Sequence, residues 1–286
     1  MSDERDDFYI GYAHEAPRSL GERTRFVALC LLTAAAFAGL ILTCSQYEYD
    51  HGIFEYGVER DFVGRVELTP FPILVVTRAG AEGERDPARP ATTKEVARPV
   101  ADAAVASNEF SRYLLVAPGK FGAHELFASR NGKSVRFRGS LAYREGRTLV
   151  EVVPGSIAEL PASATHLDER IPLGTVTLVG EIVDSKCYLG VMNPGRAKPH
   201  RACAVRCLSG GIPPLFIARD NEGRAAQMLL VGSDGRALNR EILDFVAEPV
   251  KITGALTRTG DLLILRAEPG SIERTQAESP RKRTNF

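Results

Sequence analysis

The sequence predicts a mainly β protein in which a single N-terminal transmembrane helix precedes two tandem five-stranded β-barrels. Each barrel is expected to carry a short helix between its third and fourth strands. Three observations predict this architecture: an uncharged apolar run over residues 26–44, an internal repeat with a spacing of 115 residues, and short strands in which apolar and polar residues alternate.

The charge composition argues against a nucleic-acid partner. The chain has 286 residues, with 36 Lys and Arg against 36 Asp and Glu, so its formal net charge is zero. Because proteins that bind nucleic acid carry a basic excess to neutralise phosphates, we expect no nucleic-acid partner. A hydrophobic content of 44% excludes a disordered chain.

The apolar run is long enough to cross a bilayer. Residues 26–44 contain no charged side chain, and only Thr33 and Thr43 are weakly polar. At 1.5 Å per residue this segment forms roughly 28 Å of helix, close to the hydrocarbon thickness of a membrane. It exceeds the usual apolar core of a cleaved signal peptide, so we expect an uncleaved anchor.

The flanking charges predict the orientation of this helix. Arg18, Arg23 and Arg25 precede it, whereas the charged residues that follow it are Glu48, Asp50, Glu55 and Glu59, with no Lys or Arg before Arg60. The positive-inside rule therefore places a tail of residues 1–25 in the cytoplasm and residues 45–286 in the periplasm. We expect a single-pass protein of the bacterial inner membrane, whose partners are the membrane and a membrane-protein complex.

An internal repeat organises the rest of the chain. Residues 112–157 align without a gap to residues 227–272, and the alignment ends in four consecutive identities, Pro154-Gly155-Ser156-Ile157 against Pro269-Gly270-Ser271-Ile272. A weaker match extends upstream of both segments. The repeat predicts a first domain over residues 45–160 and a second over residues 172–272.

Each repeat reads as five strands and one helix. Residues 62–66, 71–76 and 114–116 are expected to form the first three strands, and residues 177–182, 212–217 and 229–231 their counterparts. Helices are expected over residues 123–130 and 239–246. Residues 135–138 and 250–253 alternate with period two, and Gly139 and Gly254 follow where a strand bends round a small barrel. This order of elements is that of the OB-fold.

The second repeat resembles OB-fold-like secreted or periplasmic domains of bacteria that carry a D-x-x-C…H-x-x-C-x-x-x-C loop. The resemblance covers residues 172–272 and is carried by Gly180, Asp184, Cys187, Cys203, Cys207 and residues 250–256. It implies a fold and an extracytoplasmic compartment. This family has no established activity.

Two insertions distinguish the repeats. In the first repeat, residues 79–111 are rich in Pro, Arg, Glu and Ala, and we expect a mobile surface insertion. In the second repeat, residues 186–211 contain all the cysteines that follow the apolar helix. A disordered tail is expected over residues 273–286.

The cysteine loop contains the main candidate site. Pro199 is placed to open a helix that residues 209–211 close, and His200, Cys203 and Cys207 then project from one face of it. Cys187, at the end of a strand, is expected to meet that face. Asp184 is expected to cap the turn before Cys187.

Three interpretations of this loop compete. The first is a structural disulfide from Cys187 to Cys203 or Cys207, which an oxidising compartment favours. The second is a zinc or copper site with Cys187, His200, Cys203 and Cys207 as ligands. The third is a redox-active thiol whose thiolate form is favoured by the charges of Lys186, Arg201 and Arg206. The sequence has no haem-attachment or nucleotide-binding motif.

The function expected first is that of a membrane-anchored, extracytoplasmic accessory or assembly subunit. In this role the chain is a non-catalytic binding module of a membrane complex, such as a respiratory or electron-transfer complex. The alternative is a metal-binding or thiol-redox protein that uses the cysteine loop. No residue pattern points to a catalytic site.

Overall fold

The computed structural model describes residues 18–45, 51–77, 110–161, 170–219 and 225–275. The chain divides into two compact units, Met1–Asp50 and His51–Phe286. Most of the predicted cytoplasmic tail, nearly all of the predicted insertion over residues 79–111 and most of the predicted C-terminal tail lie outside the described residues.

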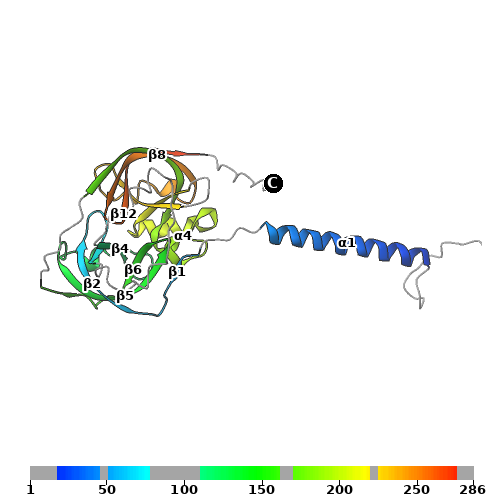
Figure 1. The fold of residues 1–286 in the computed structure, drawn as a ribbon, viewed down its shortest axis with the longest axis horizontal. Helices are drawn as coiled ribbons and strands as arrows, with labels where there is room; N and C mark the ends of the chain where they lie inside the picture. Colours follow the sequence, from blue (N-terminus) through cyan, green and yellow to red (C-terminus); the bar gives the residue numbers. More distant parts are fainter. Residues whose placement is uncertain (1–17, 46–50, 78–109, 162–169, 220–224, 276–286) are drawn as a thin grey trace, which may run out of the picture. The chain divides into compact units, whose positions relative to one another are not determined.

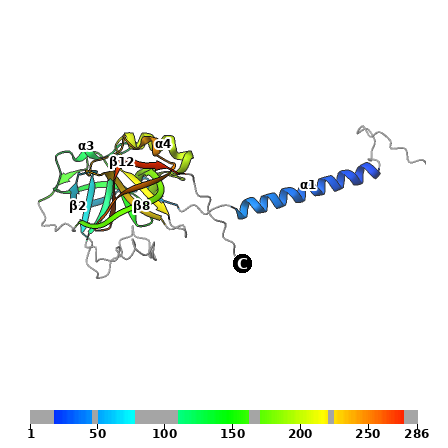
Figure 2. The same ribbon diagram turned by 90° about the horizontal axis from the view of Figure 1, so that it is seen from above.

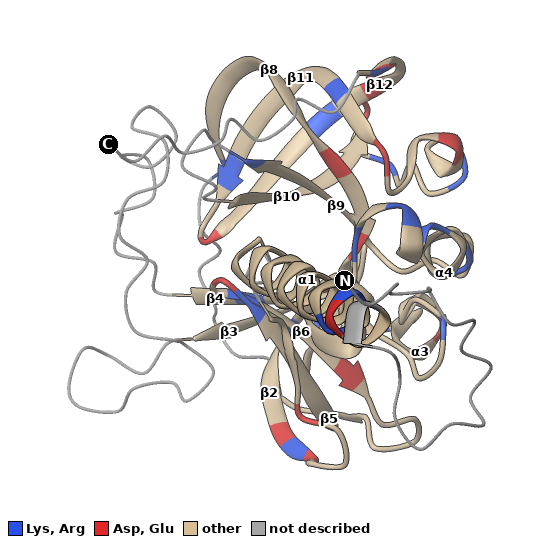
Figure 3. Ribbon diagram, turned by 90° about the vertical axis from the view of Figure 1, so that its right-hand side faces the viewer, with Lys and Arg blue, Asp and Glu red and all other residues tan. Residues whose placement is uncertain are grey.

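The first unit contains the helix α1 (Arg18–Cys44), which begins eight residues before the predicted start of the apolar run. Among the described residues it is the one helix long and apolar enough to span a membrane, with a mean hydropathy of 2.4 over its most apolar window and no burial within the unit. Charged residues occur only near its N-terminal end (Figure 3). The hydroxyls of Thr33 and Thr43 donate to the carbonyls of Leu29 and Gly39 one turn earlier, so neither needs a partner outside the helix.

The second half of the larger unit is a closed five-stranded barrel (Figure 1). Its strands are β8 (Arg170–Asp184), β9 (Pro214–Arg219), β10 (Ala225–Gly232), β11 (Pro249–Thr259) and β12 (Leu262–Arg274). The order round the barrel is β10-β12-β11-β8-β9, in which only β10 and β12 run parallel. This arrangement matches the predicted second barrel, except that β8 begins two residues before the predicted start at residue 172 and β12 continues two residues into the predicted tail.

The first half of the larger unit is a seven-stranded sheet. Its strands are β1 (Ile53–Phe54), β2 (Arg60–Glu67), β3 (Ile73–Thr77), β4 (Phe110–Val116), β5 (Ser134–Arg144), β6 (Arg147–Val152) and β7 (Ala158–Glu159). The order is β1-β5-β2-β3-β4-β6, with β7 on β5 and a further pairing of β5 with β6. As in the barrel, one pairing is parallel, that of β4 with β6.

Residues 115 positions apart occupy matching places in the two sheets. Leu114 pairs with Leu149 between β4 and β6, and Leu229 pairs with Ile264 between β10 and β12. The apolar interior of the first sheet contains Leu115, Val135, Phe137, Leu141, Val150 and Val152, and that of the barrel contains Leu230, Val250, Ile252, Leu256, Leu265 and Ala267. The same alternation of apolar residues therefore selects the buried face of both sheets.

The glycines expected at strand bends permit close approach of neighbouring strands. A Cβ at Gly139 would overlap the side chain of Val150, and a Cβ at Gly254 would overlap the carbonyl oxygen of Arg266. Each glycine lies in the strand that pairs with the last strand of its own repeat.

The predicted helices over residues 123–130 and 239–246 are wrong in length. The first is a single turn, α3 (His124–Phe127), and the second is reduced to a 3-10 turn, η3 (Leu243–Phe245). In the second segment the Asn239 side-chain amide donates to the carbonyls of Leu208 and Ile212, each at 2.8 Å. These tertiary hydrogen bonds hold Asn239 at the C-terminal end of the helix α4 (Ala197–Ser209), and they stabilise the segment more than the helical pattern of its own sequence does.

The two sheets share an apolar core. They lie one above the other in Figure 1 and overlap when the molecule is seen from above in Figure 2. The core contains Leu114, Val116 and Leu149 from the first sheet and their counterparts Leu229, Val231 and Ile264 from the barrel. Two polar contacts also join the sheets, each to a turn of the opposite sheet. The Arg112 N–H donates to Asp261 in the β11–β12 turn at 3.2 Å, and the side chain of Gln227, 115 residues later, donates to Glu145 in the β5–β6 turn at 3.1 Å.

Candidate functional site

The predicted cysteine loop leaves the barrel at the end of β8 and returns to it at β9. It forms a π-helical turn, η2 (Cys187–Val191), and the helix α4 (Ala197–Ser209), which begins two residues before the predicted Pro199. The turn lies against β1: a Cβ at Gly190 would overlap the carbonyl oxygen of Ile53. The loop is therefore held between the barrel and the first sheet.

Three cysteines of this loop converge. The Sγ atoms of Cys187, Cys203 and Cys207 all lie within 4.8 Å of one another, and the Sγ atoms of Cys187 and Cys203 are 3.9 Å apart. Cys187 and Cys207 are buried and Cys203 is partly exposed. The predicted meeting of the strand end with the face of α4 is confirmed for these three residues.

The expected disulfide is not present. All five cysteines fall within the described residues and all are free. The 3.9 Å between Cys187 and Cys203 is far from the S–S bond length of about 2.05 Å. The Cys203 sulfur instead accepts a hydrogen bond from a lysine.

His200 belongs to a neighbouring group and does not share one site with all three cysteines. Its Nε2 lies 2.8 Å from Oδ2 of Asp184, and both side chains are almost fully buried. Oδ1 of Asp184 accepts the Cys187 backbone N–H at 2.8 Å, which confirms the predicted cap. Asp184, Cys187 and His200 form a second set of candidate ligand atoms within 4.8 Å of one another. The predicted four-ligand set is thus divided, with Cys187 common to both halves.

The sequence interpretation missed Lys120. This residue lies in the loop between β4 and α3 of the first sheet, and its Nζ is 2.7 Å from Sγ of Cys203 and 3.7 Å from Sγ of Cys207. The position 115 residues later is Gly235, so the repeat gives no signal for a cation here. Only the packing of the two sheets brings Lys120 to the sulfurs.

The three thiols are electrostatically different. A hydrogen bond with Cys187 lowers the pKa of Cys207, and the charge of Lys120 acts in the same direction. The same hydrogen bond, together with burial, raises the pKa of Cys187. The hydrogen bond to Cys203 raises the pKa of Lys120. Of Cys187 and Cys207, Cys207 is therefore the thiol more easily converted to thiolate, while Cys187 stays protonated and donates.

Of the three cations expected to favour thiolate, Lys186 and Arg201 have other partners, and Arg206 is exposed. Lys186 is buried, donates to the carbonyls of Ala117 and Gly119 at 3.0 and 2.6 Å, and forms an ion pair with Glu151. Arg201 forms an ion pair with Glu248. Lys186 therefore affects the thiols only indirectly, because it holds the loop that carries Lys120 in place.

Gly210, at the end of α4, allows the backbone of the Lys120 loop to approach the helix closely. The Gly122 N–H donates to the carbonyl of Gly210 at 2.9 Å. A Cβ at Gly210 would overlap the carbonyl oxygen of Lys120. Any larger residue at this position would therefore require the backbone at Lys120 to shift.

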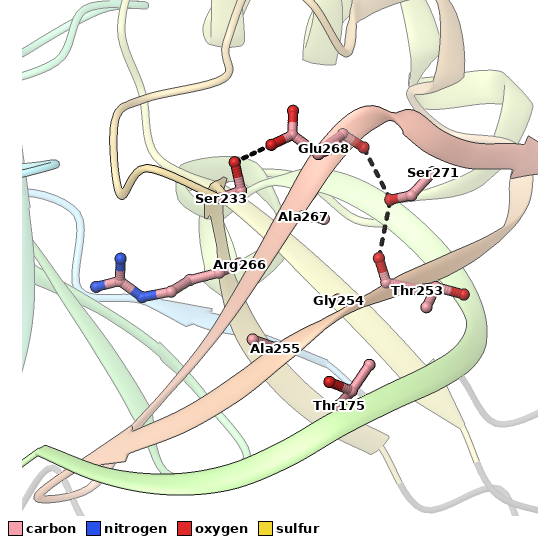
Figure 4. Close-up of a pocket in the computed structure, with 9 residues that line it drawn as sticks. All are labelled: Thr175, Ser233, Thr253, Gly254, Ala255, Arg266, Ala267, Glu268 and Ser271. Atoms are coloured by element: carbon pink, nitrogen blue, oxygen red, sulfur yellow. Dashed lines mark hydrogen bonds between the residues drawn. The ribbon is translucent and has the colours of Figure 1, made fainter.

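A shallow depression of 280 Å³ on the barrel surface shares no residue with this site (Figure 4). Its polar groups largely satisfy one another: the Ser271 hydroxyl donates to the carbonyls of Thr253 and Glu268, and Ser233 bonds the Glu268 carboxylate. The depression therefore offers few unpaired groups to a ligand, and the cysteine cluster is the stronger candidate.

No protein-family model matches the sequence, and no curated protein matches it. The solved structure of a deletion mutant of the single-stranded DNA binding protein from Thermus aquaticus aligns with 82% of this chain and 100% of its own, with 14% identity and a TM-score of 0.20. Similarity at that level supports no argument about fold or function.

Proposed function

We propose that this chain is a membrane-anchored, extracytoplasmic protein that binds a thiophilic metal ion, zinc or copper(I), through Cys187, Cys203 and Cys207. The observation that carries the proposal is the convergence of three sulfurs within 4.8 Å of one another. Thiolates are the protein ligands that these ions prefer. Metal–sulfur distances of about 2.3 Å place sulfurs about 3.8 Å apart round a tetrahedral ion and about 4.0 Å apart round a trigonal one. The 3.9 Å between Cys187 and Cys203 suits both.

The Asp184–His200 pair supports this role from outside the sulfur set. Asp184 fixes the backbone of Cys187 with one carboxylate oxygen and engages the imidazole with the other. His200 falls in the set with Asp184 and Cys187 and does not converge with all three sulfurs. We therefore assign the pair to the positioning of Cys187 and the three sulfurs to the metal.

We also infer that the first sheet closes as a second OB-like barrel and that the two barrels are copies. Each of its five long strands has two neighbours, in the ring β5-β2-β3-β4-β6 that returns to β5, which matches the ring of the barrel strand for strand. Arg112 and Gln227, 115 residues apart, each contact a turn of the other sheet, β11–β12 and β5–β6 respectively, and such exchanged contacts favour two equivalent surfaces that meet about an approximate two-fold axis.

The membrane placement extends the same proposal. The arginines before the apolar part of α1 and the acidic residues after it favour a cytoplasmic N-terminus and periplasmic sheets. The expectation that the chain is an accessory subunit of a membrane complex stays a prediction. Its molecular mass in mild detergent tests it, because migration as a lone monomer would contradict it.

Metal analysis of the full-length protein tests the proposed function. The chain is purified in detergent under anaerobic, reducing conditions, and bound zinc and copper are measured after loading with each ion. We expect one ion per chain in the wild type and none in a C187S/C203S/C207S variant whose circular dichroism is unchanged. A C30S/C44S variant, altered only in α1, is the matched control and should keep the ion. A fully reduced wild type that binds neither ion overturns the proposal.

A further inference from the structure

We infer that the ion is monovalent copper and that Lys120 of the first sheet selects it. The inference rests on the proposed metal-binding function and extends it, because it names the ion and adds a residue from outside the cysteine loop. Two independent features of the site lead to it, the number of available ligands and the charge beside them.

The number of ligands favours copper(I). Zinc in protein sites is almost always four-coordinate, and a structural zinc site takes all four ligands from the protein. Here three sulfurs converge, while His200 falls in a separate set with Asp184 and Cys187. Copper(I) accepts three thiolates in a trigonal arrangement, so the cluster satisfies it without a change at His200.

The charge beside the cluster favours the same ion. Three thiolates with copper(I) carry a net charge of −2, whereas three thiolates with zinc carry −1. The attraction between an ammonium group and the complex is proportional to the charge of the complex, so a nearby lysine stabilises the copper form more. Lys120 is the cation in that place, at 2.7 Å from Cys203 and 3.7 Å from Cys207.

Lys120 is directed to the sulfurs by the fold. In the part of the chain that the structure describes, it forms no ion pair with a carboxylate, and both of its side-chain hydrogen bonds go to sulfur. Its loop is anchored on each side of the residue, by the buried Lys186 at Ala117 and Gly119 and by the bond from Gly122 to Gly210. The other charges next to the cluster occur as internal pairs, Asp184 with His200 and Lys186 with Glu151. Lys120 is thus the one unpaired charge of the described residues that touches the sulfurs.

The test compares the affinities of the full-length protein in detergent for copper(I) and zinc, each measured by competition with a chromogenic chelator under anaerobic conditions. The variants are K120M, which removes the charge but keeps much of the stem, and K120R, which keeps the charge. Lys120 is exposed, so both should fold, and K120Q provides a second neutral variant. We expect K120M and K120Q to lose about tenfold in affinity for copper(I), about threefold or less for zinc, and K120R to keep the wild-type ratio.

The outcomes separate this inference from the proposed function. If the wild type binds neither ion, the metal-binding function itself is wrong. If the wild type binds copper(I) but K120M changes both affinities equally or neither, the metal site stands and the role of Lys120 is refuted. A wild type that holds zinc more tightly than copper(I) also refutes the inference.

Discussion

Asp184 links the barrel to the cysteine cluster, and its removal should have a large effect. Its carboxylate is fully buried and makes two contacts of 2.8 Å, one with the Cys187 backbone N–H and one with the His200 ring. Replacement by alanine leaves both partners buried without an acceptor. Replacement by asparagine keeps the shape, the acceptor for Cys187 and a polar contact with His200.

The structure sets the expected magnitude. Leaving a buried polar group without its hydrogen-bond partner costs about 1–3 kcal/mol, and more where a charge is involved, so the loss of both contacts together costs about 3–5 kcal/mol. We therefore expect D184A to lower the free energy of unfolding by about that amount, which corresponds to roughly 6–20 °C in Tm for a unit of this size. D184N should cost about 1–2 kcal/mol, the scale of weakening a hydrogen bond without deleting it.

The measurement is urea unfolding of the full-length protein in detergent at neutral pH, followed by circular dichroism because the chain has no Trp. A cycle with H200Q separates the histidine contact: D184A should cost less when His200 is already replaced. If D184A stays within about 1 kcal/mol of the wild type, or if the two substitutions are additive, Asp184 does not hold this site together.

Two further predictions concern close packing and a buried carboxylate. G210A should lower the free energy of unfolding by about 1–3 kcal/mol, because the new Cβ overlaps the carbonyl oxygen of Lys120. The control G270A has open space at its Cβ and should stay within about 0.5 kcal/mol of the wild type. Equal urea midpoints for the two variants would contradict the packing argument. Burial raises the pKa of Glu181, although the hydrogen bond from the Ala197 N–H acts in the opposite direction. The folded state therefore binds a proton at Glu181 more tightly than the unfolded state. This contribution to stability is complete below pH 4.5, the ordinary pKa of a glutamate, and is lost as the pH rises above that value. E181Q should therefore gain stability relative to the wild type between pH 4 and 7, and parallel pH curves in urea unfolding would argue against this.

The strands could be predicted because their pattern is local. In β5 and β11, alternate apolar residues mark the buried face, and the spacing of 115 residues transfers each assignment to the other sheet. The short helices could not be predicted in the same way. A segment of a few residues takes its conformation from tertiary contacts, as Asn239 does when its amide bonds the end of α4.

The candidate site was predictable only where it is local. Cys203 and Cys207 lie one turn apart on α4, and Asp184 accepts the N–H of Cys187, three residues further along the chain. The spacing of these residues in the sequence was sufficient to predict both contacts. The disulfide was inferred from the compartment, and a compartment gives no information on how far apart the sulfurs lie. Lys120 is 83 residues from Cys203 in sequence, and no local pattern connects a lysine in a surface loop with a thiol in another repeat.

The proposed metal site lies where the two sheets meet, so its function depends on the contact between them. In the proposed duplication, each sheet offers the same apolar face, so both copies alone would form a near-symmetric pair joined by apolar packing and by the turn contacts of Arg112 and Gln227. The insertion that carries the cysteines in one copy, and a lysine where the other copy has Gly235, break that symmetry at the same junction. Because the sulfurs come from one copy and the cation from the other, the charge of the site depends on the sheets remaining docked. A change that loosens the shared core around Leu149 and Ile264 should therefore act on metal binding as well as on stability.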